Sequence, residues 1–229
     1  MDIKIISGIV AFAIIALAIG LMIPGGQEPP PQTYPWQIDI TADGATRVFG
    51  ITLGKSTLRQ AEQVFQAEAE LSLFEVPDDN GQRNKDRRNN GQRIIEAYFD
   101  KVDPGGLSAR VIAVMDIAQD QLQAIYQRGI RISTLGDGSR KVTLHEEDVQ
   151  HVRGSTIAGM TYLPRIRLDT ALLEKRFGKP AQVIKENDND TTHWLYPGKG
   201  LDVALDTHGN AVLQYVLPSR FNQLIEPLK

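Results

Sequence analysis

The tripeptide Gly54-Lys55-Ser56 is the first place where this sequence could do chemistry. It matches the end of a P-loop, in which backbone amides and a lysine hold nucleotide phosphates. The full motif needs a glycine five residues before Gly54, and that position is Phe49. Ser56 or Thr57 instead suits a helix N-cap, since a hydroxyl can accept a hydrogen bond from the first turn. We therefore expect a helix start here and no nucleotide site.

A second candidate is the acidic stretch that begins at His145. Glu147 or Asp148 could share a helical face with His151, which suits a weak zinc site. The His-Glu-x-x-His spacing is missing, and an acid-rich first turn also favours a helix through its dipole. We therefore expect a solvated acidic turn and no metal or other cofactor.

The remaining candidates give no catalytic residue. His193 and His208 fall near the C-terminal strands without a predicted partner, and no Gly-x-Ser-x-Gly elbow is present. Carboxylate pairs of the glycosidase type are spatial, so a sequence does not reveal them. Trp194, Tyr196 and Tyr215 are expected to pack the sheet rather than to form an exposed aromatic patch. We predict no enzyme and name no catalytic, cofactor-binding or metal-binding residue.

The clearest functional signal is the uncharged apolar run from Ile5 to Ile23. A helix of this length spans about 28 Å, close to the ~30 Å hydrocarbon core of a bilayer. Lys4 precedes the run and the next basic residue is Arg47, which predicts a cytoplasmic N-terminus and an exported remainder. We expect a single-pass anchor in a bacterial inner membrane. A cleaved signal peptide is the alternative, because Ala16-Leu17-Ala18 fits the small-x-small cleavage pattern.

Composition narrows the function of the exported part. The chain has no cysteine, which excludes a bacterial lipid anchor and any disulfide. Its net charge is -3, with acids and bases mixed, which disfavours nucleic acid as a partner. Residues 77–93 contain no apolar side chain after Pro77 and predict a solvated loop. The weakly basic character of this loop leaves an anionic partner such as a lipid head group open.

Periodicity predicts an α+β fold. Trp36–Thr41 and Thr46–Ile51 flank the turn signal Asp43-Gly44 and predict an opening hairpin. A helix is expected from Thr57 to about Leu73, and another from Asp169 to Phe177, each followed by antiparallel strands. Further strands are expected at 93–102, 107–117, 130–133, 141–144, 157–163, 192–196, 201–206 and 211–217, and short helices at 120–127 and 145–151.

These elements divide the chain into five predicted parts. They are a membrane anchor helix at 1–23, a Pro/Gly-rich linker at 24–35, a first α+β module at 36–117 that includes the polar loop, a connecting region at 118–164 and a second α+β module at 165–229. Thr57–Phe65 and Asp169–Phe177 share a cap, an apolar residue, a Glu and a Phe at equal spacings. The two modules are therefore expected to be degenerate copies.

The run from Asp169 to Pro180, followed by Trp194-Leu195-Tyr196 and a meander with glycine turns, resembles the SmpA/OmlA (BamE-type) family and the wider β-lactamase-inhibitor-like αβ fold. A weaker match begins at Gly50. Members of that group are small envelope proteins that bind other proteins, so the resemblance implies a non-catalytic protein-protein interaction module. Its envelope members are typically lipoproteins, from which this cysteine-free chain departs.

We therefore expect a membrane-anchored periplasmic protein that binds another envelope protein, in envelope assembly or maintenance. The alternative is an exported hydrolase acting on a cell-wall or polymeric substrate. A pocket that gathers several Asp, Glu and His side chains would favour the hydrolase, and a surface with grooves alone would not.

Overall fold

The computed structural model describes residues 33–76, 92–186 and 190–228. Residues from Thr33 onward form one compact unit. Within the described ranges, no helix has the length and apolar character needed to cross a bilayer. The predicted anchor at 1–23, most of the linker at 24–35 and most of the polar loop at 77–93 lie outside the described residues.

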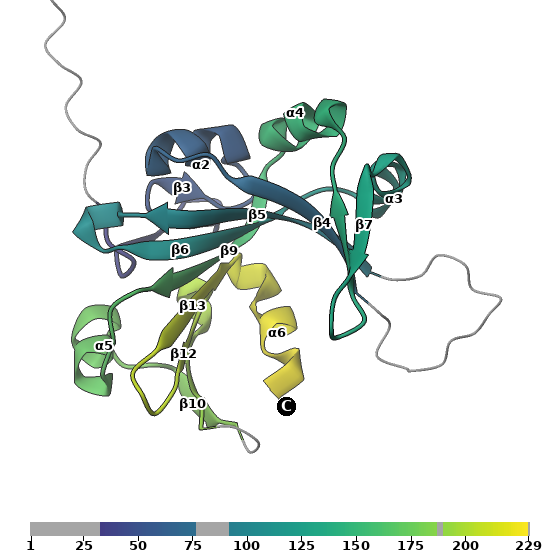
Figure 1. The fold of residues 1–229 in the computed structure, drawn as a ribbon. Coiled ribbons are helices and arrows are strands. Elements are labelled where there is room, and N and C mark those ends of the chain that lie inside the picture. The colour runs from purple at the N-terminus through teal and green to yellow at the C-terminus, as the bar shows by residue number, and fades with distance from the viewer. Residues whose placement is uncertain (1–32, 77–91, 187–189, 229) are drawn as a thin grey trace, which may run out of the picture. The chain divides into compact units, whose positions relative to one another are not determined.

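The predicted α+β class is confirmed, with two antiparallel sheets (Figure 1). The smaller sheet contains β1 (Ile38–Ile40), β2 (Thr46–Val48) and β3 (Ile51–Thr52). The larger sheet has ten strands in the order β10-β11-β12-β13-β9-β6-β5-β4-β8-β7. Its strands are β4 (Glu70–Val76), β5 (Gln92–Val102), β6 (Ala109–Met115), β7 (Arg131–Thr134), β8 (Arg140–Thr143), β9 (Ile157–Pro164), β10 (Gln182–Lys185), β11 (Thr192–Tyr196), β12 (Leu201–Leu205) and β13 (Ala211–Val216).

Helices contribute to both faces of the larger sheet. They are α2 (Leu58–Phe65), α3 (Gln119–Arg128), α4 (Glu146–Gly154), α5 (Thr170–Phe177) and α6 (Phe221–Leu224), with short 3-10 turns at Pro104–Gly106, Pro197–Lys199, Pro218–Arg220 and Glu226–Leu228. The buried residues of α2, α3, α4 and α5 belong to the main core. Phe221 of α6 packs instead on Leu195 in a second, smaller cluster.

Alternation along the strands selects the core face. Ile95, Ala97 and Phe99 of β5 are buried in the main core, and the residues between them are half-buried. Leu201, Val203 and Leu205 on β12 also belong to the main core, although Asp202 between them is buried as well. Phe65 of α2 meets Phe99 edge to face, with ring centroids 5.2 Å apart. One face of the sheet therefore carries the main core.

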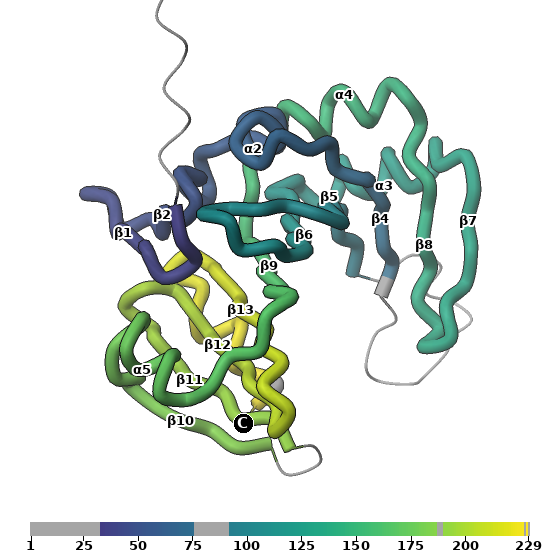
Figure 2. The backbone as a smooth tube through the Cα atoms, turned by 60° about the vertical axis from the view of Figure 1, so that its left-hand side comes forward, coloured from purple at the N-terminus to yellow at the C-terminus, as the bar shows by residue number. Residues whose placement is uncertain are grey.

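Outward from the β13–β9 pair, the first four strands on each side follow in reverse chain order, β13-β12-β11-β10 and β9-β6-β5-β4, and β8 and β7 extend the second side only (Figure 2). α5 precedes β10 to β13 directly, and α2 precedes β4, β5 and β6, whereas α3, β7, β8 and α4 come between β6 and β9. A proline-containing 3-10 turn joins β5 to β6, and another joins β11 to β12. The sheet runs without a break through the predicted connecting region, because β9 lies at its centre. The predicted duplication and module boundaries stay predictions.

Two predicted elements are wrong in extent. The first helix ends at Phe65 rather than near Leu73, because Gln66 adopts a left-handed conformation and β4 begins at Glu70. Leu71 and Leu73 are apolar because they alternate on a strand, which helical spacing over a short window does not distinguish. The predicted strand Thr46–Ile51 is split by a turn at Phe49 and Gly50, both with positive φ. The opening hairpin itself is confirmed.

Candidate functional site

A band of half-buried side chains crosses the four central strands on the face opposite the main core. The register aligns Tyr98, Ile112, Thr161 and Gln214 as successive cross-strand neighbours on β5, β6, β9 and β13. Since residues two apart on a strand share a face, their neighbours complete the band. We define the open face as Ile94, Glu96, Tyr98, Ile112, Val114, Thr161 and Gln214, all of which are partly exposed.

The open face combines aliphatic, aromatic and polar groups. Figure 1 shows its strands side by side at the middle of the sheet. The core face of the same strands is fully buried, with Val111 and Ala113 on β6 as examples. A solvated strand face is mostly polar, whereas the open face is half-buried and largely apolar and aromatic. In these respects it is similar to the core of a protein-protein interface.

Glu96 is the charged residue of the open face. Its cross-strand neighbours are Ser72 on β4 and Val114 on β6, neither of which is charged. Burial raises the pKa of Glu96 above its usual value. Among the described residues, the carboxylate of Glu96 has neither an ion pair nor a side-chain hydrogen bond. A partly desolvated carboxylate without a partner is unfavourable, so a cationic group brought by a ligand would relieve that cost.

A buried histidine between two carboxylates lies at the other end of the sheet. His193 Nδ1 is 2.7 Å from Asp202 Oδ2, and its Nε2 is 2.8 Å from Glu186 Oε1. With both ring nitrogens facing carboxylates, the protonated imidazolium can donate to both. Burial opposes the charged ring, but the hydrogen bonds to Asp202 and Glu186 outweigh it and raise the pKa of His193. Burial likewise raises the pKa of Asp202, which His193 partly offsets.

The sequence offered no indication of these partners of His193. Asp202 lies opposite Leu195 across β11 and β12, two residues along from His193 on the same face. This proximity depends on strand register, which the sequence does not reveal. His193 and Asp202 are both buried, and neighbouring Leu195 is covered by Phe221 of α6. His193 and Asp202 are therefore buried, while the side chain of Glu186 stays 27% exposed, and we interpret the trio as a structural cluster.

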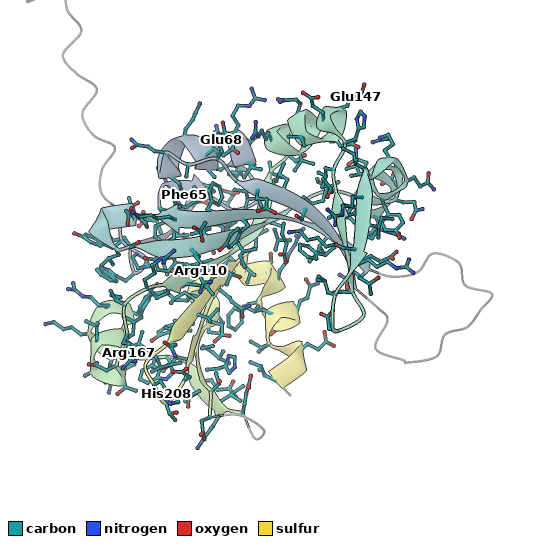
Figure 3. All side chains as sticks on the ribbon, viewed as in Figure 1. Phe65, Glu68, Arg110, Glu147, Arg167 and His208 are labelled. Carbon is teal, nitrogen blue, oxygen red and sulfur yellow. The ribbon has the colours of Figure 1, made fainter. Side chains whose placement is uncertain are left out.

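A groove of about 600 Å³ runs beside the start of α5. Arg167 and His208 line it, and Figure 3 shows both at this end of the molecule. Two of the three acids that line it cap backbone N–H groups: Asp169 accepts a hydrogen bond from Leu172 N at 2.7 Å, and Asp206 accepts one from His208 N at 2.9 Å. A hydrogen bond from Asn210 lowers the pKa of Asp206. The lowered pKa of Asp206 does not suit a general acid, which needs a raised one. The groove nevertheless gathers Asp169, Asp190, Asp206 and His208, as the hydrolase alternative requires.

The P-loop-like tripeptide lies where a helix begins, as expected. Thr57 accepts a hydrogen bond from Gln60 N, and the Gln60 side chain accepts one from Thr57 N, so the two form a capping box. Ser56 Oγ accepts a hydrogen bond from Thr52 N at 3.0 Å, and Lys55 pairs with Asp43 at 2.8 Å. The side chains of Lys55, Ser56 and Thr57 are thus all engaged in contacts within the protein.

The residues of the acidic turn have separate roles. His145 caps α4 by accepting a hydrogen bond from Glu147 N, and Asp148 is buried against Arg128. His151 is exposed. Within the described ranges, no three His, Cys, Asp or Glu residues come close enough to hold a metal ion.

The C-terminal aromatic residues pack as expected. Tyr215 is fully buried and donates a hydrogen bond to Pro35 O at 2.8 Å. Tyr196 is buried and donates to Gly178 O at 2.9 Å, and Trp194 packs partly against the main core. They do not form an exposed binding patch.

Comparison with known proteins adds one distant similarity. No protein-family profile and no curated protein sequence matches the chain. Among solved structures, the chain is similar to YjgB, a DUF4309 family protein from Bacillus subtilis subsp. subtilis str. 168, with 12% sequence identity and a TM-score of 0.34. The match covers 76% of this chain and 88% of that one.

Proposed function

We propose that this protein is a membrane-anchored envelope protein that binds another envelope protein through its open face. The observation that carries the proposal is Glu96, a partly desolvated carboxylate without a partner among the described residues, set in a half-buried apolar surface on central strands. Such a group gains most from a cationic side chain delivered by a partner. The uncharged run from Ile5 to Ile23 supports the membrane address.

The proposed role requires binding and no catalysis. His193 and Asp202 are buried and bonded to each other, and Asp169 and Asp206 of the groove near α5 accept hydrogen bonds from backbone N–H groups. The partner is expected to present a lysine or arginine flanked by apolar side chains, since these would meet Glu96, Ile112 and Tyr98. By analogy with the resemblance at 169–196, the proposed context is envelope assembly or maintenance.

Crosslinking in living cells, followed by affinity purification and mass spectrometry, tests this proposal. The matched variants are Thr161→Arg on the open face and Thr170→Arg at the exposed start of α5. We expect one reproducible envelope partner from wild type and Thr170→Arg, and its loss from Thr161→Arg. Recovery of no reproducible partner from wild type, or equal recovery from both variants at equal thermal stability, would contradict the proposal.

A further inference from the structure

In the part of the chain that the structure describes, strand β7 pairs with β8 alone and forms one edge of the ten-stranded sheet. Its four residues, Arg131 to Thr134, are all exposed. Figures 1 and 2 both show β7 on the outer side of the sheet, with the β7–β8 hairpin extending beyond α3. An uncovered edge presents backbone groups that another chain can pair with.

The hairpin geometry identifies which backbone groups are available. Leu135 N donates to Ser139 O at 2.8 Å, which directs the backbone groups of Leu135 toward β8. Because this direction alternates along an antiparallel strand, Ser133 and Arg131 also face β8. The N–H and C=O groups of Ile132 and Thr134 therefore face the free edge.

The side chains of this edge are more apolar than an edge strand usually allows. Ile130 is 65% exposed, Ile132 49% and Leu135 40%. Natural edges are normally protected by lysine, proline, a bulge or a cover. The opposite edge strand, β10, carries Lys185 in its four residues, whereas β7 has neither lysine nor proline.

Among the described residues around β7, one cation has no ion pair. Three neighbouring cations are paired with acids, namely Arg128 with Asp148, Arg140 with Glu75, and Lys141 with Glu70. Asp137, at the hairpin tip, accepts hydrogen bonds from Ser139. Arg131 has no ion pair among the described residues, so the edge attracts a carboxylate.

We propose that β7 binds an extended segment of a partner protein as an added antiparallel strand. The segment carries an apolar residue opposite Ile132 and, at the adjacent position, a carboxylate beside Arg131. Backbone hydrogen bonds to Ile132 and Thr134 hold the segment, and the two side-chain contacts select it. This site lies on an edge of the sheet, does not use the open face, and stands independently of the function proposed above.

Hydrogen exchange measured by NMR on the full-length chain tests the proposal. The probe is a synthetic ten-residue peptide in which valine alternates with glutamate and threonine. In the free chain, the amides of Ile132 and Thr134 should exchange quickly, and the inward-facing amide of Ser133 slowly. Saturation with the peptide should slow exchange at Ile132 and Thr134 by tenfold or more.

A charge swap separates specific binding from general adhesion. Arg131→Glu should weaken the glutamate peptide at least tenfold and should bind a matching lysine peptide instead, while Lys185→Glu on β10 should change neither affinity. Absence of peptide-dependent protection at Ile132 and Thr134 would overturn the proposal. Protection that rises with protein concentration alone would also overturn it, because a second copy would then occupy the edge.

Discussion

His193 shows how a single buried side chain links strand register to pH. Its two carboxylate contacts join the end of β10, β11 and β12, and they favour the imidazolium over the neutral ring. A raised pKa in the folded state means that this stabilisation is complete below the unfolded value of about 6.5. It is lost as the pH rises through the folded value.

Replacement of His193 should therefore remove the fall in the free energy of unfolding that wild type shows as the pH rises. At pH 6, His193→Gln should lower the free energy of unfolding by about 2 kcal/mol, because buried hydrogen bonds to charged groups are lost. Above the ordinary histidine pKa of about 6.5, wild type should lose stability as the pH rises through the raised pKa of His193, while the variant stays nearly constant. Urea unfolding across this range measures the effect, and the exposed His208→Gln serves as the control. Parallel curves for wild type and His193→Gln would contradict the account.

Replacement of Glu96 with glutamine should raise the stability of the folded state at neutral pH. Burial raises the pKa of Glu96, so the folded state favours the protonated carboxyl and loses stability as the pH rises through that value. At pH 7.5, Glu96→Gln should be more stable than wild type by about 0.5 kcal/mol, and at pH 4 the two should be equal. Chemical denaturation at both pH values measures this difference. The exposed Glu174→Gln on α5 should give no such gain, and a loss of stability in Glu96→Gln at pH 7.5 would refute the prediction.

At the scale of elements, the turn between β11 and β12 connects the two sheets. Thr46 of β2 donates a bifurcated hydrogen bond to Lys199 O at 3.0 Å and to Val216 O at 2.9 Å. Gly200 makes this approach possible with a φ of +62°, since a Cβ there would lie 2.0 Å from Val216 O and 2.7 Å from Thr46 Oγ1. The small sheet therefore packs against the turn at Gly200, where a side chain would clash.

Alanine substitutions at Gly200 and Gly198 should distinguish a glycine required by close packing from one that is not. Gly200→Ala should lower the free energy of unfolding by about 3 kcal/mol or more, because backbone strain and a backbone clash add. Gly198→Ala has no atom within 4 Å of the added Cβ and should stay within about 0.5 kcal/mol of wild type. Thermal or urea unfolding of both variants measures the contrast. Equal stabilities would show that the turn is not the tight junction described.

Sequence periodicity predicted those elements whose signals are local. Thr57 and Asp169 cap their helices as expected, and the alternation on β5 and β12 selects the core face as expected. The helix predicted from Thr57 extends wrongly to about Leu73, over the first residues of β4, because the apolar residues there continue a helical pattern. The open face, the partners of His193 and the edge position of β7 all depend on strand register and order. No local spacing encodes these contacts, so the candidate site could not be predicted from sequence.

At the scale of the whole molecule, the proposed protein consists of a membrane anchor, predicted from the sequence, and a folded unit that binds a partner. The anchor prediction concerns Ile5 to Ile23, which lie outside the described residues. Intact mass spectrometry of the membrane-extracted protein should give the uncleaved chain. A chain that begins at Ile19 would instead make the segment a discarded signal and the protein free in its compartment. The binding prediction would survive that result.

Site-directed photocrosslinking tests the central claim most directly. A benzoylphenylalanine introduced at Tyr98 keeps an aromatic ring on the open face, and the same group at Gln63 on α2 is the exposed control. After irradiation of living cells, we expect a discrete adduct with one envelope protein from position 98 and none from position 63. Adding Glu96→Lys to the chain that carries the probe at position 98 should abolish the adduct. No adduct at position 98, or the same adduct from both positions, would contradict binding through the open face.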